Sequence, residues 1–295
     1  MTQLIEKYLR YLRYERNYSP RTEISYSEDL HQFAEFVGQN CKDVDLQTVD
    51  ADIVRLWIVS LMELNLSARS VNRKLSALKS FYRYLLRIGE IEANPLKKIV
   101  GPKTKKPLPS FVNYSDMEKV LSEDNFDNTF HSLRDRLILE IFYVTGIRRA
   151  ELIGIKDVDV DFSAKTLQVT GKRNKQRIIP LSDSLINMIY LYISAREKEV
   201  EGASGYLFVK ENGEPLYPML VHRIVNERLA WIPTLTKTSP HVLRHSFATG
   251  MLNNGADINA VKELLGHSSL ASTEVYTHTS FEELKKIYNK AHPRA

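Results

Sequence analysis

The fold is decided by a stretch that interrupts the helical patterns of the chain, NPLKKIVGPKTKKPLPS at residues 94–110. Its prolines lack backbone N–H donors and fix the backbone angle φ, so the stretch cannot form the interior of a helix. Its lysines have no acidic residue among them, which is typical of a solvated connector. The sequence therefore predicts two domains, residues 1–89 and 109–295, joined by a basic Pro/Lys linker at residues 90–108.

The bulk properties agree with two domains and a polyanionic partner. A chain of 295 residues is long for one hydrophobic core and sufficient for two. The formal net charge of +5 points toward a polyanionic partner, although many proteins without such a partner are equally basic. The single cysteine, Cys41, excludes an internal disulfide and a CxxC metal cluster. Because the first sixteen residues lack the apolar core of a signal peptide and no stretch could span a bilayer, we expect a cytoplasmic protein.

Four helical patterns precede the linker. The second, third and fourth follow Ser19, Asp50 and Ser67, which are residue types that cap helix N-termini, and Gly38 and Gly89 are expected to end the second and fourth. Apolar residues recur along each pattern with helical period. The first domain is therefore predicted to be a compact four-helix module.

The fourth of these patterns is unusually basic. It carries Arg69, Arg73, Lys74, Lys79, Arg83 and Arg87 with no acidic residue between Ser67 and Gly89. A solvated helix face usually mixes charges of both signs, so this pattern favours a face that contacts phosphates. We predict DNA contacts by Arg69, Arg73 and Lys74. The linker lysines Lys103 and Lys105 either follow a DNA backbone or serve only solubility.

The second domain is predicted to be mainly α-helical with a small β-sheet. Ser115 and Glu118 have the spacing of a capping box, and residues 137–144 form an apolar helix. Two short strands, 166–170 and 176–181, flank the turn sequence GKRNK and indicate a β-hairpin. Further helices are expected after Ser184, at 217–231, after Ser239, after Asp257 and after Ser280.

Several residues of this domain suit the cleavage of a phosphodiester. The reaction needs a nucleophile, cations on the non-bridging oxygens and a proton donor for the leaving oxygen. Arg148 follows an apolar helix, and Arg244 lies within the sequence HVLRH at 241–245. Two guanidinium groups can grip one phosphate by paired hydrogen bonds. Tyr276 offers a phenolic nucleophile, although it is one of 15 tyrosines.

The two histidines of HVLRH allow a different reading. His241 and His245 have the i, i+4 spacing of zinc ligands on a helix. The glutamate of HExxH is missing and no third ligand follows from the sequence, so phosphodiester chemistry is the favoured interpretation.

Five segments, in order, resemble the signature segments of the tyrosine recombinase (phage integrase) family. They are TGIRRAEL at 145–152, GKRNKQR at 171–177, HVLRHSFAT at 241–249, LLGH at 264–267 and YTH at 276–278. The resemblance covers nearly the whole chain and is strongest to the bacterial Xer recombinases. It implies a SAM-like core-binding domain at residues 1–89 and an α+β catalytic domain with the DNA breaking-rejoining fold.

The resemblance also implies roles for individual residues. Tyr276 would form a 3′-phosphotyrosyl link, while Arg148 and Arg244 clamp the scissile phosphate. Lys172 would protonate the leaving 5′-hydroxyl, with Lys175 as its rival for that role. The remaining assignments are a proton-transfer role for His241, a phosphate contact for His267, an orienting role for the acid Glu151, and an added phosphate contact or altered loop for Arg173, which stands where many relatives have glycine.

The partners implied by the resemblance are a double-stranded DNA recombination site and further recombinase protomers. Four protomers, identical or shared with a second Xer recombinase, would assemble on two DNA sites, and residues 281–291 resemble a terminal helix that relatives dock into a neighbouring protomer. The Xer likeness implies resolution of chromosome dimers during segregation at cell division, together with a DNA translocase of the FtsK type. No cofactor, metal ion or ATP is expected, because one phosphodiester is exchanged for another. The alternatives are a mobile-element integrase and a non-cleaving DNA-binding protein of the same fold.

Overall fold

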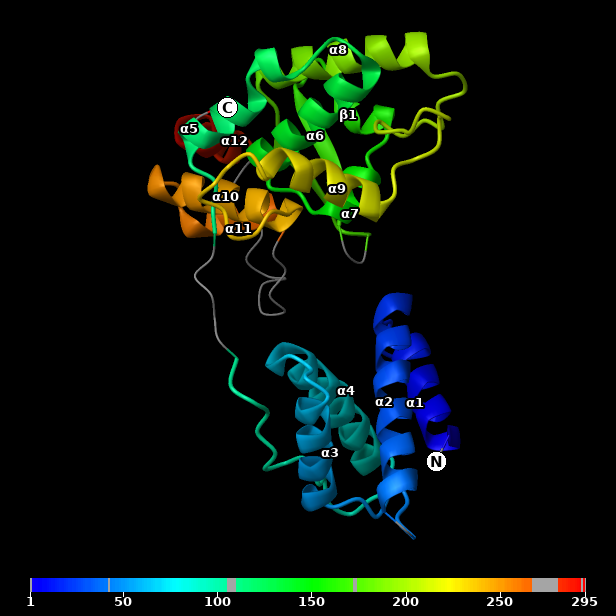
Figure 1. Cartoon of the computed structure of the whole chain (residues 1–295). Helices are drawn as coiled ribbons and strands as arrows, with labels where there is room; N and C mark the ends of the chain where they lie inside the picture. The colour runs from blue at the N-terminus through cyan, green and yellow to red at the C-terminus, as the bar shows by residue number, and fades with distance from the viewer. Residues whose placement is uncertain are drawn as a thin grey trace. The chain divides into compact units, whose positions relative to one another are not determined.

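The computed structural model describes residues 2–41, 43–104, 110–171, 174–266, 281–292 and 294, without the side chains of Phe281 and Glu282. The chain divides into two compact units, Met1–Pro107 and Leu108–Ala295. The described residues of the first unit form helices and loops without a strand, and the second unit is mainly helical with one small sheet (Figure 1). No helix in these stretches combines the length and the apolar character that a membrane span needs.

The first unit contains the four predicted helices. They are α1 (Thr2–Tyr14), α2 (Pro20–Asn40), α3 (Ala51–Glu63) and α4 (Ala68–Arg87). Ser19, Asp50 and Ser67 accept hydrogen bonds from backbone N–H groups of the following first turns, which confirms these three residues as N-caps. Gly38 does not end the second helix, because α2 continues through it for two further residues.

One face of each helix is buried in a shared core. Phe33 of α2 and Trp57 of α3 meet edge to face with ring centroids 4.9 Å apart, and both side chains are fully buried. Tyr82 of α4 donates its hydroxyl hydrogen to the Leu46 carbonyl at 2.8 Å, so even the polar atom of this buried ring is satisfied.

The predicted linker at residues 90–108 is wrong in its first part. Ile91, Leu96 and Ile99 are buried in the helical core. Lys79 donates to the Ile99 carbonyl and Asn72 to the Pro102 carbonyl, each at 2.8 Å. The chain is therefore fixed to the first unit as far as Pro102. The many prolines and lysines of this segment indicated a solvated connector. Its three apolar side chains nevertheless pack into the core.

The second unit is built around α6. Its helices are α5 (Tyr114–Leu121), α6 (Phe130–Thr145), α7 (Arg149–Ile153), α8 (Asp183–Glu199), α9 (Pro218–Leu229), α10 (Pro240–Asn253), α11 (Ile258–Leu265) and α12 (Phe281–Ala291), with short 3-10 turns at Glu123–Asn125 and Asp157–Asp159. Every residue of α6 from Leu137 to Thr145 is buried. A helix that is buried all round belongs to a core rather than to a surface, and α8, α9 and α10 pack against it (Figure 1).

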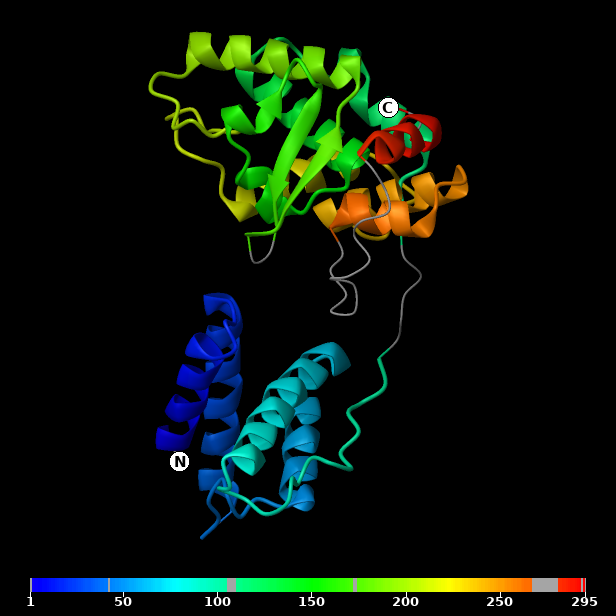
Figure 2. The same cartoon turned by 180° about the vertical axis from the view of Figure 1, so that it is seen from behind.

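The sheet is small and antiparallel, with the order β1 (Val160–Asp161), β2 (Thr166–Thr170), β3 (Gln176–Pro180). The predicted hairpin of β2 and β3 is confirmed, with Thr170 opposite Gln176 at the turn. Figure 2 shows its two arrows side by side. The capping box predicted at Ser115 is wrong, because the N-cap of α5 is Asn113, two residues earlier, and it makes no side-chain hydrogen bond.

Gly146 ends α6 at the point where three helices meet. Its φ of 59° lies in the left-handed region, which glycine adopts without the steric cost of a Cβ atom. A Cβ added there would lie 2.6 Å from Phe247 of α10 and 2.8 Å from Leu265 of α11. Glycine therefore allows α10 and α11 to close onto the end of α6, beside the start of α7.

The terminal helix α12 packs on the domain of its own chain. It contacts α10, α11 and β3, and Figure 2 shows it beside α10 and α11. The ring of His292 stacks between Phe247 and Tyr288, with both centroid distances 5.5 Å. Arg294 donates to the buried carboxylate of Glu140 at 2.6 Å. In the single chain these contacts hold the helix in place without a neighbouring protomer.

Candidate active site

Arg148 and Glu151 are joined at the first turn of α7. Arg148 is the N-cap residue, and its backbone N–H donates to Glu151 Oε2 at 2.8 Å. Its Nη1 donates to Glu151 Oε1 at 2.7 Å. The carboxylate is only 4 % exposed, whereas the arginine side chain is 30 % exposed. The acid therefore fixes the buried side of Arg148 and leaves the guanidinium accessible to a ligand.

Arg244 of α10 bridges two helix ends. Its Nη1 donates to the Gly146 carbonyl at the end of α6, and its Nη2 donates to the Leu265 carbonyl at the end of α11 at 2.8 Å. The last carbonyls of a helix have no partner within the helix and carry partial negative charge. They hold the guanidinium by hydrogen bonds without placing a competing carboxylate against it.

The two arginines line one pocket of about 110 Å³. Its lining comprises Ile147, Arg148, Arg149, His222, Ser239, Pro240, His241 and Arg244. Three arginines and two histidines face this space, and the described residues of its lining include no Asp or Glu. Guanidinium groups form paired hydrogen bonds to phosphate oxygens, so the pocket suits a phosphate group.

The electrostatics of the cluster favour a bound anion. Burial and the nearby charge of Arg148 lower the pKa of Arg244 to about 10. Burial opposes the ionisation of Glu151, but hydrogen bonds from Arg177 and Arg148 outweigh it and hold the pKa of Glu151 below its usual value. Glu151 is thus ionised and Arg244 protonated at neutral pH. A phosphate would relieve the repulsion between Arg148 and Arg244.

The structure brings four of the predicted site residues together: Arg148, Glu151, His241 and Arg244. Lys172, Arg173, His267 and Tyr276 lie outside the described residues, as does Lys105 of the linker. The described residues that precede two of them in the chain do reach the cluster. A Cβ on Gly171 would lie 3.3 Å from Glu151 Oε1, and the Gly266 carbonyl accepts from Arg148 at 3.2 Å.

The basic face predicted on α4 is partly neutralised within the first unit. Arg73 and Lys74 both donate to Asp29 of α2, whose side chain is 1 % exposed, with 2.9 Å from Lys74 Nζ to Oδ1. The side chain of Lys74 is itself only 12 % exposed. In this chain Lys74 is therefore held by Asp29, and Arg73 reaches solvent as part of the same ion pair. DNA contacts by these two residues remain predictions. Arg69 and Lys103 are exposed, and their DNA contacts remain predictions.

Arg177 is the residue of the cluster that the sequence did not single out. It lies on β3 directly opposite Val169 of β2, so it shares the buried face of the hairpin with a side chain that is 1 % exposed. Its Nη2 donates to Glu151 at 2.9 Å and its Nε to the Leu264 carbonyl at 2.8 Å. A charged residue on the apolar side of a strand was the signal that could have revealed it. His222 and Arg149 of the pocket lining carried no comparable signal.

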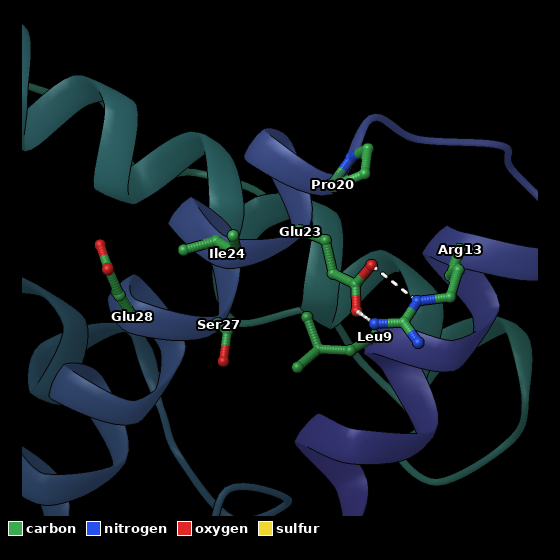
Figure 3. A pocket seen from close by; sticks show the side chains of 7 residues that line it. All are labelled: Leu9, Arg13, Pro20, Glu23, Ile24, Ser27 and Glu28. Atoms are coloured by element: carbon green, nitrogen blue, oxygen red, sulfur yellow. Dashed lines mark hydrogen bonds and ion pairs between the residues drawn. The ribbon is translucent and has the colours of Figure 1, made fainter.

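A second pocket lies between α1 and α2 of the first unit (Figure 3). Its lining residues are Leu9, Arg13, Pro20, Glu23, Ile24, Ser27 and Glu28. The one arginine is already held by Glu23, at 2.6 and 2.9 Å, as the dashed lines in Figure 3 show. Two carboxylates and a neutralised arginine do not suit a polyanion, so this pocket is not the candidate site.

Two protein-family models match the chain, one within each unit. The model of the phage integrase family matches residues 111–283, and that of the phage integrase N-terminal SAM-like domain matches residues 5–89. The chain therefore belongs to the phage integrase family, the tyrosine recombinases, which are enzymes that cut and rejoin DNA.

The similar proteins include Xer recombinases. The chain is 39% identical to tyrosine recombinase XerC of Chlorobaculum parvum, covering 99% of this chain and 94% of that protein. It is 38% identical to tyrosine recombinase XerC of Listeria innocua, covering 99% and 98%. Among solved structures, the XerH site-specific recombinase in its post-cleavage complex with palindromic difH substrate is similar with a TM-score of 0.73 at 25% identity, covering 96% of this chain and 82% of that one.

Proposed function

We propose that this tyrosine recombinase acts at a specific DNA site through a 3′-phosphotyrosyl intermediate, and that its role is of the Xer type. The observation that carries the proposal is the pocket in which Arg148 and Arg244 are held by Glu151 and by helix-end carbonyls. Each guanidinium keeps further N–H groups beyond those used on the protein, and these can donate to phosphate oxygens. The arginine pair is thus oriented before DNA arrives.

In the proposed reaction, the Tyr276 oxygen attacks the scissile phosphorus and a new P–O bond to tyrosine forms. The bond from phosphorus to the 5′ oxygen breaks, and that oxygen takes up a proton from Lys172 or Lys175. A free phenol has a pKa of about 10 and is a weak nucleophile at neutral pH. His241 would accept its proton, while Arg148, Arg244 and His267 stabilise the charge on the phosphate.

Rejoining is the reverse exchange with a new 5′-hydroxyl as nucleophile. The phosphotyrosyl link conserves the bond energy of the phosphodiester, so the exchange needs no external energy source. The similarity to XerC and to XerH bound to a difH substrate supports a double-stranded recombination site as substrate. Four protomers assembled on two DNA sites would complete strand exchange. They would be either four copies of this chain or two copies each of this chain and a second Xer recombinase. In the second case this chain would take either the XerC-like or the XerD-like role.

The proposed cellular role is the resolution of chromosome dimers during segregation at cell division. It would take place in the cytoplasm with a DNA translocase of the FtsK type. Similarity to proteins named XerC supports this role over that of a mobile-element integrase.

Covalent trapping on DNA tests the proposed chemistry. The protein first selects its binding site from random-sequence duplexes, and that site is then prepared with a nick moved stepwise along one strand. Cleavage beside the nick releases a short fragment, so the covalent adduct accumulates and can be counted on a denaturing gel. We expect adduct with the parent protein, none with Tyr276→Phe, and parent levels with the matched control Tyr190→Phe, whose ring is exposed on α8.

Two results would contradict the proposal. Adduct from Tyr276→Phe would assign the nucleophile to another residue. A parent protein that binds its selected site tightly but forms no adduct at any nick position would be a non-cleaving DNA-binding protein of this fold.

A further inference from the structure

Three arginines from three different elements converge on the last turn of α11. Arg177 Nε donates to the Leu264 carbonyl at 2.8 Å, Arg244 Nη2 to the Leu265 carbonyl at 2.8 Å, and Arg148 Nη2 to the Gly266 carbonyl at 3.2 Å. Successive carbonyls at the end of one helix thus each accept from a guanidinium. These carbonyls lack partners within the helix and carry its partial negative charge.

Arg177 differs from the other two arginines in its surroundings. It does not line the pocket of Arg148 and Arg244, and its side chain is only 12 % exposed. Its second contact is Nη2 to Glu151 Oε2 at 2.9 Å, while Arg148 holds the other oxygen of the same carboxylate at 2.7 Å. Arg177 and Arg148 are therefore connected through the two oxygens of the Glu151 carboxylate.

Gly266 shows how closely Arg177 fits the end of α11. A Cβ added to Gly266 would lie 3.1 Å from Arg177 Nη1 and 3.3 Å from its Cδ and Cζ, and the residue has a φ of +63°. The left-handed turn at Gly266 and the guanidinium of Arg177 thus lie against each other. Arg177 connects β3, the acid of α7 and the chain that leads from α11 to His267.

We propose that Arg177 is a positioning residue for strand cleavage. It sets the place of Arg148 through Glu151 and fixes the end of α11 through the Leu264 carbonyl. The inference rests on the proposed function, because cleavage is the reaction that it affects. The two contacts use Nε and Nη2 of one planar group, and a lysine ammonium cannot reproduce both at once.

The test compares Arg177→Gln, Arg177→Lys and the matched control Lys210→Gln on the nicked duplex described above. Lys210 also forms an ion pair in the second unit, with Glu214 at 2.6 Å, but it is not part of the arginine cluster. For Arg177→Gln we expect DNA affinity within about twofold of the parent, because phosphate contacts are spread over many basic residues. We expect the single-turnover rate constant for adduct formation to fall about 100-fold, the scale of a misplacement near 1 Å. Arg177→Lys should recover part of that loss, and Lys210→Gln should match the parent.

The kinetics separate positioning from a loss of folded protein. Misfolding lowers the final amount of adduct but leaves the rate constant of the active fraction unchanged, whereas loss of positioning lowers the rate constant itself. In a Glu151→Gln background, the further loss of Arg177 should cost less than tenfold, because residues that act as a unit are not additive. If Arg177→Gln does not fold, the rate constant of Arg177→Lys decides the question in the same way.

A parent-like rate constant in both Arg177 variants would overturn the inference and leave the proposed function intact. So would a full 100-fold loss in the Glu151→Gln background, since the two residues would then act independently. A parent protein that forms no adduct would instead overturn the proposed function itself.

Discussion

At the scale of single residues, Arg244 shows how the fold prepares a phosphate site. Helix-end carbonyls hold the guanidinium, and burial with the neighbouring charge of Arg148 lowers its pKa to about 10. The group stays protonated at neutral pH and lies close to a like charge. An anion between the two arginines removes this repulsion, so the site without a ligand is electrostatically complementary to phosphate.

Replacement of Arg244 by lysine should separate binding from cleavage. A lysine keeps the charge but cannot donate to Gly146 and Leu265 and also form a paired contact with phosphate. We expect Arg244→Lys to bind the selected DNA within a few-fold of the parent protein. Its single-turnover cleavage should be slower by about 100-fold to 1,000-fold, the usual effect of removing one donor from a charged transition state. The DNA affinity and the cleavage rate constant of Arg244→Lys and the parent protein are measured on the nicked duplex. Cleavage at the parent rate would show that Arg244 does not contact the scissile phosphate.

The sequence identified three residues of the pocket and the acid that supports them, but it did not single out Arg177. Arg148, Glu151, His241 and Arg244 lie in segments that resemble the family, and the structure places them together. Arg177 lay in such a segment too, yet its role depends on Glu151, 26 positions away, and on a carbonyl 87 positions away. Contacts of this range follow from how α7, α11 and the hairpin pack, which local patterns do not reveal.

At the scale of elements, His292 fastens α12 to the second unit. Burial lowers the pKa of His292 to about 4, so the folded protein holds this ring in its neutral form. In the unfolded chain the ring titrates near its ordinary value of about 6.5. The stability that depends on neutral His292 is therefore complete above about pH 6.5 and is lost progressively as the pH falls toward 4.

This titration predicts a specific pH dependence of unfolding. Between pH 6.5 and 4, His292 should lower the free energy of unfolding by about 3 kcal/mol, from about 1.4 kcal/mol for each unit of pKa difference. His292→Phe keeps an aromatic ring between Phe247 and Tyr288 and should remove this contribution. Urea unfolding at several pH values measures the free energy of unfolding of the parent protein and of His292→Phe. Glu140 is present in both proteins, so its contribution cancels when the two pH dependences are subtracted. Equal pH slopes would refute the neutral, buried state of His292.

The contact between α2 and α4 pairs two basic residues of α4 with an acid that the charge pattern of α4 alone does not contain. The acid that neutralises Arg73 and Lys74 is Asp29, which lies more than forty positions earlier in the sequence. A helix read alone cannot show an ion pair with its neighbour. The same limit applies to Ile91, Leu96 and Ile99, whose burial depends on a core formed by other elements.

Lys74 and Arg69 should therefore respond differently to substitution. Lys74→Met leaves the buried carboxylate of Asp29 with one cationic partner fewer, and we expect the free energy of unfolding to fall by about 1–3 kcal/mol. Arg69→Met removes an exposed charge, so stability should stay within about 0.5 kcal/mol of the parent protein. DNA affinity should weaken, with a shallower dependence on salt. Thermal unfolding and salt titrations of binding compare the two variants, and a stability loss confined to Arg69→Met would reverse these assignments.

At the scale of the whole molecule, the residues proposed to act on DNA phosphate lie in one of the two units. All described members of the arginine cluster belong to the second unit, within the residues matched by the phage integrase model. The sequence predicted the fold class and most helix starts, because N-caps and apolar periodicity are local. The sequence predicted that the linker begins at residue 90. In the structure, the first part of that segment packs into the core of the first unit.

In the proposed reaction, Tyr276 forms the covalent link to DNA. The most direct measurement is mass spectrometry of the trapped adduct after digestion with protease and nuclease. We predict that the peptide containing Tyr276 carries a nucleotide joined to the tyrosine through its 3′-phosphate. A nucleotide on any other residue, or one joined through a 5′-phosphate, would contradict the account.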